Sequence, residues 1–191
     1  MLMFAIHAYR DADLSREQVR AVVSLLNSIW SNKDKTLDEL TDAFIDAAQA
    51  KEQPGDKKAV PRRFVIWEEN QAIAHANTFE RTLLTVDGPI PVMALSGVCV
   101  AATHRGRGLG EAISRKALDR VDRGDFALSL FQTPVPAFYA RLGARTVDNR
   151  FVNSTHEQDP EAYPWIAPYV MIYPKHHPWP DGVIDINGPR Y

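Results

Sequence analysis

Three glycines lie close together in Arg105-Gly106-Arg107-Gly108-Leu109-Gly110. Glycine lets the backbone approach an anion because no Cβ atom stands in the way. The free N–H groups and the positive dipole end of a helix that follows such a turn also favour negative charge. These residues therefore predict a site for a phosphorylated ligand between about Val98 and Gly110.

Two predicted elements position this turn. Residues 95–100, Leu-Ser-Gly-Val-Cys-Val, form a short apolar, β-branched segment that is typical of a buried strand. Residues 111–121 are typical of an amphipathic helix, with apolar Ile113, Ala117 and Val121 at every fourth position. A strand, a glycine-rich turn and a helix in succession form a phosphate-binding arrangement.

Two common nucleotide motifs do not fit this turn. A Walker A loop ends in Gly-Lys-Ser/Thr, whereas Gly110 is followed by Glu111. A dinucleotide fingerprint has the pattern G-x-G-x-x-G, and counting from Gly106 places Glu111 where the third glycine should stand. The phosphate ligand is therefore expected to be held by a different type of loop.

The pattern Arg105-x-x-Gly108-x-Gly110 after the 98–100 strand resembles the acetyl-CoA pyrophosphate loop of the GNAT N-acetyltransferase superfamily. A second block, Phe-Tyr-Ala-Arg-Leu-Gly-Ala at 138–144, resembles the later signature of that superfamily, an aromatic pair on a helix that ends at a glycine. The resemblance covers roughly residues 92–147 by motif. A further likeness is to the aminoglycoside 2′-N-acetyltransferase branch.

The resemblance implies an α/β (α+β) chain with the GNAT fold: a mixed, mostly antiparallel central sheet with flanking helices and splayed central strands. The length suits one domain over residues 1–191. The C-terminal part is rich in proline but also in aromatic residues, which predicts an irregular packed tail at about 174–191. Within this order we expect strands at 126–131, 145–152 and 169–173, and a loop over Lys51–Pro61. Capping boxes at 15–18 and 36–39 predict two helix starts.

The resemblance also implies site residues, with acetyl-CoA as co-substrate and no metal. Tyr139 stands where the superfamily has a general acid that protonates the departing thiolate, and a phenol is protonated at neutral pH. Gln132 stands where many members have an asparagine, seven residues before the tyrosine, and keeps the amide for a CoA contact. The remaining residues expected to hold acetyl-CoA, first the pantetheine arm and then the pyrophosphate, are Val98, Cys99, Val100, Arg105, Gly106, Arg107, Gly108, Leu109 and Gly110.

The sequence leaves the general base and the acceptor site open. Some members carry a glutamate on the strand before the phosphate loop, but residues 94–97 contain no carboxylate. Glu80, Glu68 and His75 are candidate bases, and a backbone carbonyl with a water relay is an equal alternative. Asp185 and Tyr191 belong to an alternating tail that either borders the acceptor cleft, where carboxylates attract an ammonium group, or only covers a sheet edge.

Simpler interpretations stand beside these roles. Tyr139 is also explained as a core aromatic residue. Cys99, the single cysteine, is best explained as a small buried hydrophobe, and the adjacent His176 and His177 as an exposed pair without a third metal ligand. Thr133 and Pro134 predict the start of the helix that carries Tyr139, at N-cap and N1, with Val135, Tyr139 and Leu142 on one face.

Composition narrows the function classes. The 191 residues are 45% hydrophobic, which suffices for a core, and the net charge of −2 argues against nucleic acid as a partner. No apolar run approaches the ~18 residues of a membrane span, and no signal peptide is visible. We therefore expect a cytoplasmic protein, with no nucleic-acid or membrane partner and with a homodimer left open.

The expected function is transfer of an acetyl group from acetyl-CoA to a primary amine of a small molecule, by direct attack. Two alternatives stay open: transfer of a longer acyl chain from its thioester, and a non-catalytic CoA-binding module.

Overall fold

The computed structural model describes residues 4–50 and 61–191. These residues form two compact units, which are described separately. Unit 1 falls within Met1–Thr78 and Gly97–Ala117, and unit 2 comprises Phe79–Ser96 and Leu118–Tyr191. Three elements, β3 (Gln71–Thr85), β4 (Gly88–Val100) and α3 (Leu109–Asp122), run through both units.

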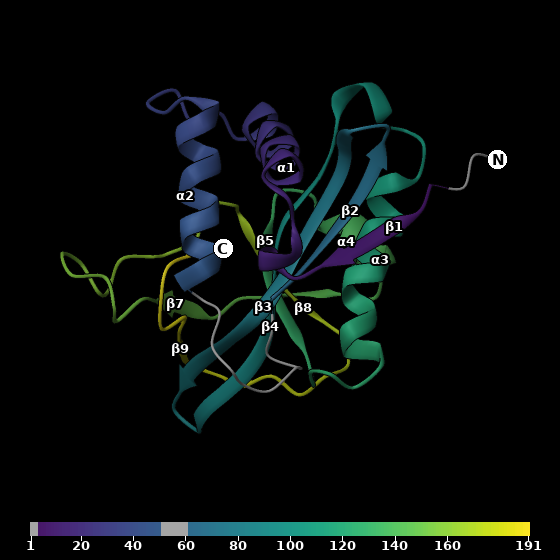
Figure 1. Cartoon of the computed structure of the whole chain (residues 1–191). Helices are drawn as coiled ribbons and strands as arrows, with labels where there is room; N and C mark the ends of the chain where they lie inside the picture. Colours follow the sequence, from purple (N-terminus) through teal and green to yellow (C-terminus); the bar gives the residue numbers. More distant parts are fainter. Residues whose placement is uncertain (1–3, 51–60) are drawn as a thin grey trace. The chain divides into compact units, whose positions relative to one another are not determined.

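Unit 1 contains a small antiparallel sheet, the helices α1 (Arg16–Ile29) and α2 (Leu37–Ala50) and the first part of α3 (Figure 1). Strand β1 (Ile6–Tyr9) pairs antiparallel with β2 (Arg62–Glu68), and β2 pairs antiparallel with the first part of β3. Short 3₁₀ turns lie at η1 (Asp11–Asp13) and η2 (Ala102–His104). The core of this unit joins α1 to the sheet through Val22, Leu25, Val65, Ala72 and Cys99.

Both predicted capping boxes are confirmed. The Ser15 hydroxyl accepts a hydrogen bond from the Gln18 N–H group at 3.3 Å, and the Gln18 side chain accepts one from the Ser15 N–H group at 2.9 Å. Thr36 and Glu39 make the same reciprocal contacts at the start of α2. Four orphan donors are thereby satisfied where the helices begin.

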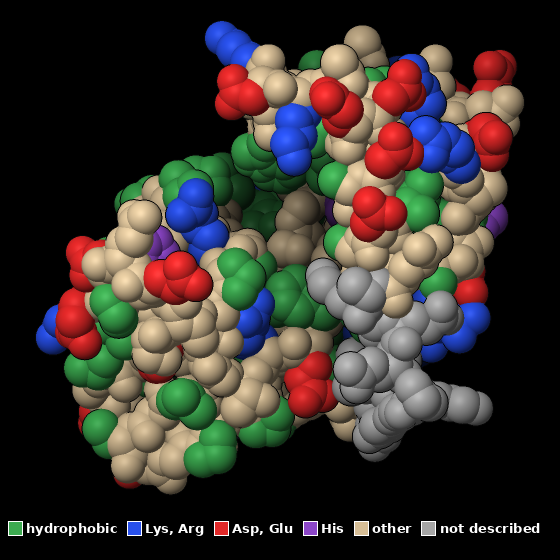
Figure 2. Space-filling view, turned by 60° about the vertical axis from the view of Figure 1, so that its left-hand side comes forward, with side chains coloured by type: hydrophobic (Ala, Val, Ile, Leu, Met, Phe, Trp, Pro, Cys, Tyr) green, Lys and Arg blue, Asp and Glu red, His purple; other side chains and the backbone are tan. Residues whose placement is uncertain are grey.

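The surface of α1 and α2 carries charges of both signs. Arg16 forms an ion pair with Asp42, and Arg20 forms one with Asp38. Acidic and basic side chains are accordingly intermingled in the upper right part of Figure 2. This face of unit 1 is a solvated helix surface rather than a patch of a single charge.

Unit 2 contains the rest of the strands. The end of β3 pairs antiparallel with β9 (Val183–Asp185), which pairs parallel with β7 (Arg150–Val152). Strand β5 (Ser129–Thr133) pairs antiparallel with β8 (Tyr169–Tyr173), and β8 pairs antiparallel with β6 (Arg145–Val147). Strand β4 pairs parallel with β5, with Met93 opposite Ser129 and Ala94 opposite Leu130. The mixed, mostly antiparallel sheet with flanking helices is confirmed.

The core of unit 2 joins β-strand residues to the C-terminal segment. Its largest fully buried side chains include Leu83, Leu128 and Phe151, and Ile184 and Ile186 contribute from the last ten residues. Trp165 and Phe151 meet edge to face at 5.7 Å between ring centroids. The alternation of apolar and polar residues at 183–186 thus buries Ile184 and Ile186 in the core of unit 2.

Three predicted boundaries are wrong. Helix α4 (Pro136–Arg141) begins two residues after the predicted Pro134, with Val135 and not Thr133 at the N-cap. A residue before proline is disfavoured in the helical region, and Val135 has φ −124° and ψ 60°. Val135 is consequently 51% exposed, so it does not share the buried face of Tyr139 and Leu142.

The other two errors concern strands. Strand β5 begins at Ser129 instead of 126, and Phe126 packs its ring under the Arg120 guanidinium at 4.9 Å. The strand expected over 145–152 is divided, because Asn149 turns to the C-terminal segment. The Asn149 amide donates to the Pro180 and Gly182 carbonyls at 3.0 Å each. The loop expected over Lys51–Pro61 lies outside the described residues except for Pro61.

Candidate functional site

The glycine-rich loop of unit 1 has the backbone that its sequence predicts. Gly106 and Gly108 have φ of +77° and +78°, and no heavy atom outside their own chain neighbours lies within 4 Å of a Cβ added at either. These positive φ angles require glycine, since L-residues rarely adopt them. The open space above both glycines lets a ligand approach the backbone.

Helix α3 follows the loop directly. Its first residue is Leu109, and the Gly108 carbonyl accepts the first helical hydrogen bond, from the Ala112 N–H group at 3.0 Å. The N–H groups of the first turn are therefore presented toward the loop, with the positive end of the helix dipole. The Arg105 side chain donates to the Val100 carbonyl at 3.3 Å, so it closes the loop against the end of β4.

A second contact anchors the beginning of the loop. His104 Nε2 lies 2.9 Å from the Glu68 carboxylate at the end of β2. His104 Nδ1 lies 2.9 Å from the Thr103 hydroxyl. Glu68, a candidate base from the sequence, is thus engaged with the turn that precedes the loop, and its catalytic role stays a prediction.

Cys99 lies in the strand before the loop and belongs to the core of unit 1. Burial raises the pKa of the Cys99 thiol to about 12, and the nearby Arg105 charge only partly opposes this. The thiol is therefore protonated at neutral pH and is a poor nucleophile. Its neighbours Val98 and Val100 are half-buried, as alternation along a strand predicts.

His75 lies in unit 1 and is 1% exposed. Its Nδ1 is 2.7 Å from the Gly97 carbonyl oxygen, and its Nε2 is 2.9 Å from Nη1 of Arg63. Arg63 in turn forms two contacts with the Asp11 carboxylate, at 2.8 and 3.1 Å. Both ring nitrogens of His75 are engaged with the protein, and its role toward the substrate stays a prediction.

Arg63 and Asp11 were not predicted as site residues from the sequence. Arg63 precedes the apolar run at 64–67 of β2, and Asp11 lies 52 residues before it. No local periodicity links two positions so far apart. The only local signal was an arginine pair, Arg62 and Arg63, at the start of a buried strand segment.

Tyr139 lies in unit 2 on α4 and is 6% exposed. Its ring contacts Phe131 at 4.6 Å and Phe138 at 4.8 Å between centroids. Gly143, with φ +99°, ends the helix at C′, as predicted. The surroundings of Tyr139 are aromatic and largely excluded from water, and its role as a general acid stays a prediction.

The Gln132 amide, expected to contact CoA, is bonded within unit 2. Its Nε2 donates to the Tyr191 carbonyl oxygen at 2.7 Å. Its Oε1 accepts from the Ile166 and Ala167 N–H groups at 2.9 and 2.7 Å. These three contacts join β5 to two segments that follow it in the chain, and a CoA contact for Gln132 stays a prediction.

The tail residues expected at the acceptor site are also placed in unit 2. The Asp185 carboxylate accepts from the Ser154 and Asn187 N–H groups at 3.1 and 2.8 Å. Burial raises the pKa of the Tyr191 phenol, and its ring lies between Trp165 and Phe79, at 5.1 and 5.4 Å. Glu80 is exposed on β3. Their roles toward an acceptor stay predictions.

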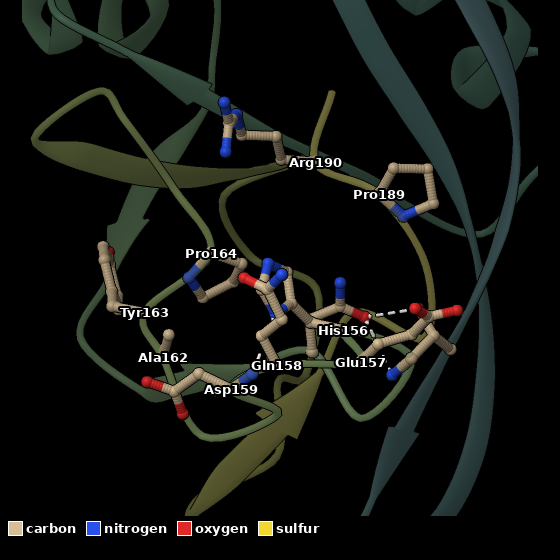
Figure 3. Close-up of a pocket in the computed structure, with 11 residues that line it drawn as sticks. His156, Glu157, Gln158, Asp159, Ala162, Tyr163, Pro164, Pro189 and Arg190 are labelled. Atoms are coloured by element: carbon tan, nitrogen blue, oxygen red, sulfur yellow. Dashed lines mark hydrogen bonds between the residues drawn. The ribbon is translucent and has the colours of Figure 1, made fainter.

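A cavity of about 790 Å³ lies beside this tail in unit 2. Figure 3 shows Pro189 and Arg190 of the tail across from the loop that carries His156, Glu157 and Asp159. No sequence motif marks the 153–164 loop, because its polar residues show no spacing that distinguishes a binding loop from an ordinary one.

Within residues 4–50 and 61–191, no three His, Cys, Asp or Glu side chains lie close enough together to hold a metal ion. In the same part of the chain no helix has the length and hydropathy to cross a bilayer.

Comparisons with known proteins agree with the fold. The family model described as an acetyltransferase (GNAT) domain matches residues 13–147. An uncharacterized N-acetyltransferase of Streptomyces avermitilis is 30% identical over 83 residues, 43% of this chain and 20% of that protein. The chain thus spans about a fifth of the length of this relative.

Two solved structures share the fold at low sequence identity. An acyl-CoA N-acyltransferase from Pseudomonas aeruginosa is 18% identical, with 76% of this chain and 89% of that chain covered and a TM-score of 0.53. Glucosamine-6-phosphate N-acetyltransferase from Arabidopsis thaliana is 15% identical, with 75% and 94% covered and a TM-score of 0.56. Because the family model matches most of the chain, this protein belongs to the GNAT acetyltransferase family.

Proposed function

We propose that the protein transfers an acetyl group from acetyl-CoA to a primary amine of a small molecule. The observation that carries this proposal is the loop before α3. Gly106 and Gly108 hold positive φ angles beside open space, and the first turn of a 14-residue helix follows them. Such a cradle suits the pyrophosphate of CoA, because a Cβ atom would fill it and backbone N–H groups favour the anion.

Residues 105–110 would hold the pyrophosphate, and the backbone of Val98, Cys99 and Val100 would hold the pantetheine arm. Acetyl-CoA supplies an activated acetyl group as a thioester. The backbone N–H groups of this strand would stabilise the negative charge that develops on the carbonyl oxygen. Cys99 would act through its backbone alone, since burial keeps its thiol protonated.

Tyr139 would donate its phenolic proton to the CoA sulfur as the thioester bond breaks. The supporting observation is that Phe131 and Phe138 hold its ring within 5 Å between centroids, so its position is fixed by packing. No covalent acyl-enzyme is needed, because the neutral amine attacks the thioester carbon directly. The C–N bond forms as the C–S bond breaks, the nitrogen loses one proton to solvent and the tyrosine phenolate regains one from solvent, so the products are an N-acetylated amine and the free thiol of CoA.

Calorimetry with acetyl-CoA tests the loop through Gly108→Asp. This change adds a Cβ atom and a negative charge where the pyrophosphate would lie, so binding should be lost. Gly124→Asp is the matched control, because Gly124 has φ +81° and equally open surroundings but lies after α3. Equal affinities in the two variants, with both folded, would refute the loop assignment.

A further inference from the structure

A buried polar chain in unit 1 ends on the strand that precedes the glycine-rich loop. It runs from Asp11 through Arg63 and His75 to the Gly97 carbonyl oxygen, by contacts of 2.8, 2.9 and 2.7 Å. Arg63 is 7% exposed and His75 is 1% exposed. A buried guanidinium or imidazole without a hydrogen-bond partner is costly. The contacts therefore favour this single arrangement of the four residues.

The chemistry of the partners fixes the proton positions in this chain. A carbonyl oxygen can only accept, so Nδ1 of His75 must donate to Gly97. A guanidinium can only donate, so Nε2 of His75 must accept from Arg63. The imidazole is therefore neutral. In agreement, burial and then the Arg63 charge lower the pKa of His75 to about 3.

Gly97 has a backbone that lies close against the His75 ring. Its φ is +60°, and a Cβ added there would lie 3.1 Å from Cε1 and 3.2 Å from Nδ1 of His75. The peptide bond between Gly97 and Val98 is trans and planar, so its C=O and N–H groups point in opposite directions. Holding the Gly97 oxygen therefore also fixes the direction of the Val98 N–H group.

We propose that His75, supported by Arg63 and Asp11, is a positioning residue that orients the Gly97–Val98 peptide for acyl transfer. The proposal rests on the proposed function, in which the Val98–Val100 backbone holds the acyl-CoA. His75 acts through the peptide and does not touch the substrate. The Val98 N–H group, directed away from His75, is the donor that this arrangement presents to the thioester oxygen.

Two variants of His75 separate this role from simple filling of the core. The amide of His75→Asn takes the position of Nδ1 and keeps a donor for the Gly97 oxygen. The longer His75→Gln takes the position of Nε2, so it keeps the Arg63 partner and loses Gly97. A core-filling role predicts equal effects of the two, or a milder effect of the glutamine.

Steady-state kinetics of both variants provide the first test. We expect His75→Gln to lower kcat about 10- to 100-fold, because a displaced group at a reacting centre costs up to about 10²-fold. The KM for acetyl-CoA should change less than kcat, and His75→Asn should restore most of the rate. An equal fall in kcat in both variants, or a change in the KM for acetyl-CoA without a change in kcat, would overturn the proposal.

Backbone NMR provides a second test that needs no turnover. In the full-length protein, the Gly97 ¹³C′ and Val98 ¹H–¹⁵N resonances should move in His75→Gln and stay near their positions in His75→Asn. Unmoved resonances in His75→Gln would overturn the positioning role. Failure of the wild-type protein to bind acetyl-CoA in calorimetry would instead refute the proposed function, so the two failures are distinguishable.

Asp11→Asn keeps the test decisive if His75→Gln does not fold. The Asp11 side chain is the outermost group of these contacts and is 15% exposed. The neutral amide of the asparagine variant would bind Arg63 more weakly and would leave His75 in place. We expect the same Val98 resonance to move in the same sense and kcat to fall less than in His75→Gln. No change in either quantity would overturn the role of Asp11 and Arg63 as supports.

Discussion

The buried His75 should make the folded state sensitive to mild acid. Its pKa is lowered from 6.5 to about 3 by burial and by the Arg63 charge. Below pH 6.5 the unfolded chain therefore binds a proton that the folded chain does not accept until about pH 3. Stability follows the difference in bound protons, by about 1.4 kcal/mol per pH unit and proton. The His75 contribution to the free energy of unfolding should thus fall by about 2 kcal/mol between pH 8 and pH 5.

Urea denaturation at pH 8 and pH 5 measures this loss, and His75→Asn is its control. The variant keeps every other titratable group, so subtracting its pH dependence removes the contributions of the carboxylates and the other five histidines. The wild-type protein should lose about 2 kcal/mol more than the variant over this interval. Parallel pH dependences would show that His75 titrates normally in the folded state, and the neutral imidazole inferred from its contacts would then be wrong.

Two further predictions concern unit 2. Tyr139→Phe keeps the buried ring and removes only the proton, so kcat should fall about 10²- to 10⁴-fold with CoA affinity nearly unchanged by calorimetry; a change below twofold with chemistry rate-limiting would leave a packing role. Gly188→Ala places a Cβ where Nη1 of Arg81 lies, so this side chain must move and lose its bonds to the Asn187 and Pro189 carbonyls. It should cost about 2 kcal/mol in urea denaturation, while Gly182→Ala, also at positive φ but without the clash, should cost less.

Local chemistry made parts of the fold predictable. The capping boxes at Ser15 and Thr36 depend on residues three positions apart, and both form. Gly143 ends its helix because a left-handed residue is needed at C′. The start of the same helix was missed, because Pro134 and Pro136 both suit a first turn and only the backbone of Val135 decides between them.

The glycine-rich loop could be predicted for the same reason. Gly106 and Gly108 can adopt positive φ angles that other residues rarely reach, and both do so, so their positions in the sequence indicated a turn that brings the backbone close to a ligand. The partners of His75 could not be predicted. Arg63 and His75 are brought together by the register of β2 and β3, Asp11 by the contact of η1 with Arg63, and Gly97 by the position of β4 beside β3. Such long-range contacts leave no periodic pattern in the sequence.

Gln132 shows how a residue at a family motif position can acquire a local structural role. Its amide satisfies two N–H groups at residues 166 and 167 and donates to the Tyr191 carbonyl, all at 2.7–2.9 Å. A side-chain amide offers one oxygen acceptor and two N–H donors, so a ligand contact can use the second N–H donor or must compete with the contact to Tyr191. The C-terminal segment is held separately by Arg81 through the Asn187 and Pro189 carbonyls. Loosening the Arg81 contacts should therefore leave the Gln132 contacts with residues 166 and 167 in place, whereas replacing Gln132 would release both segments from β5.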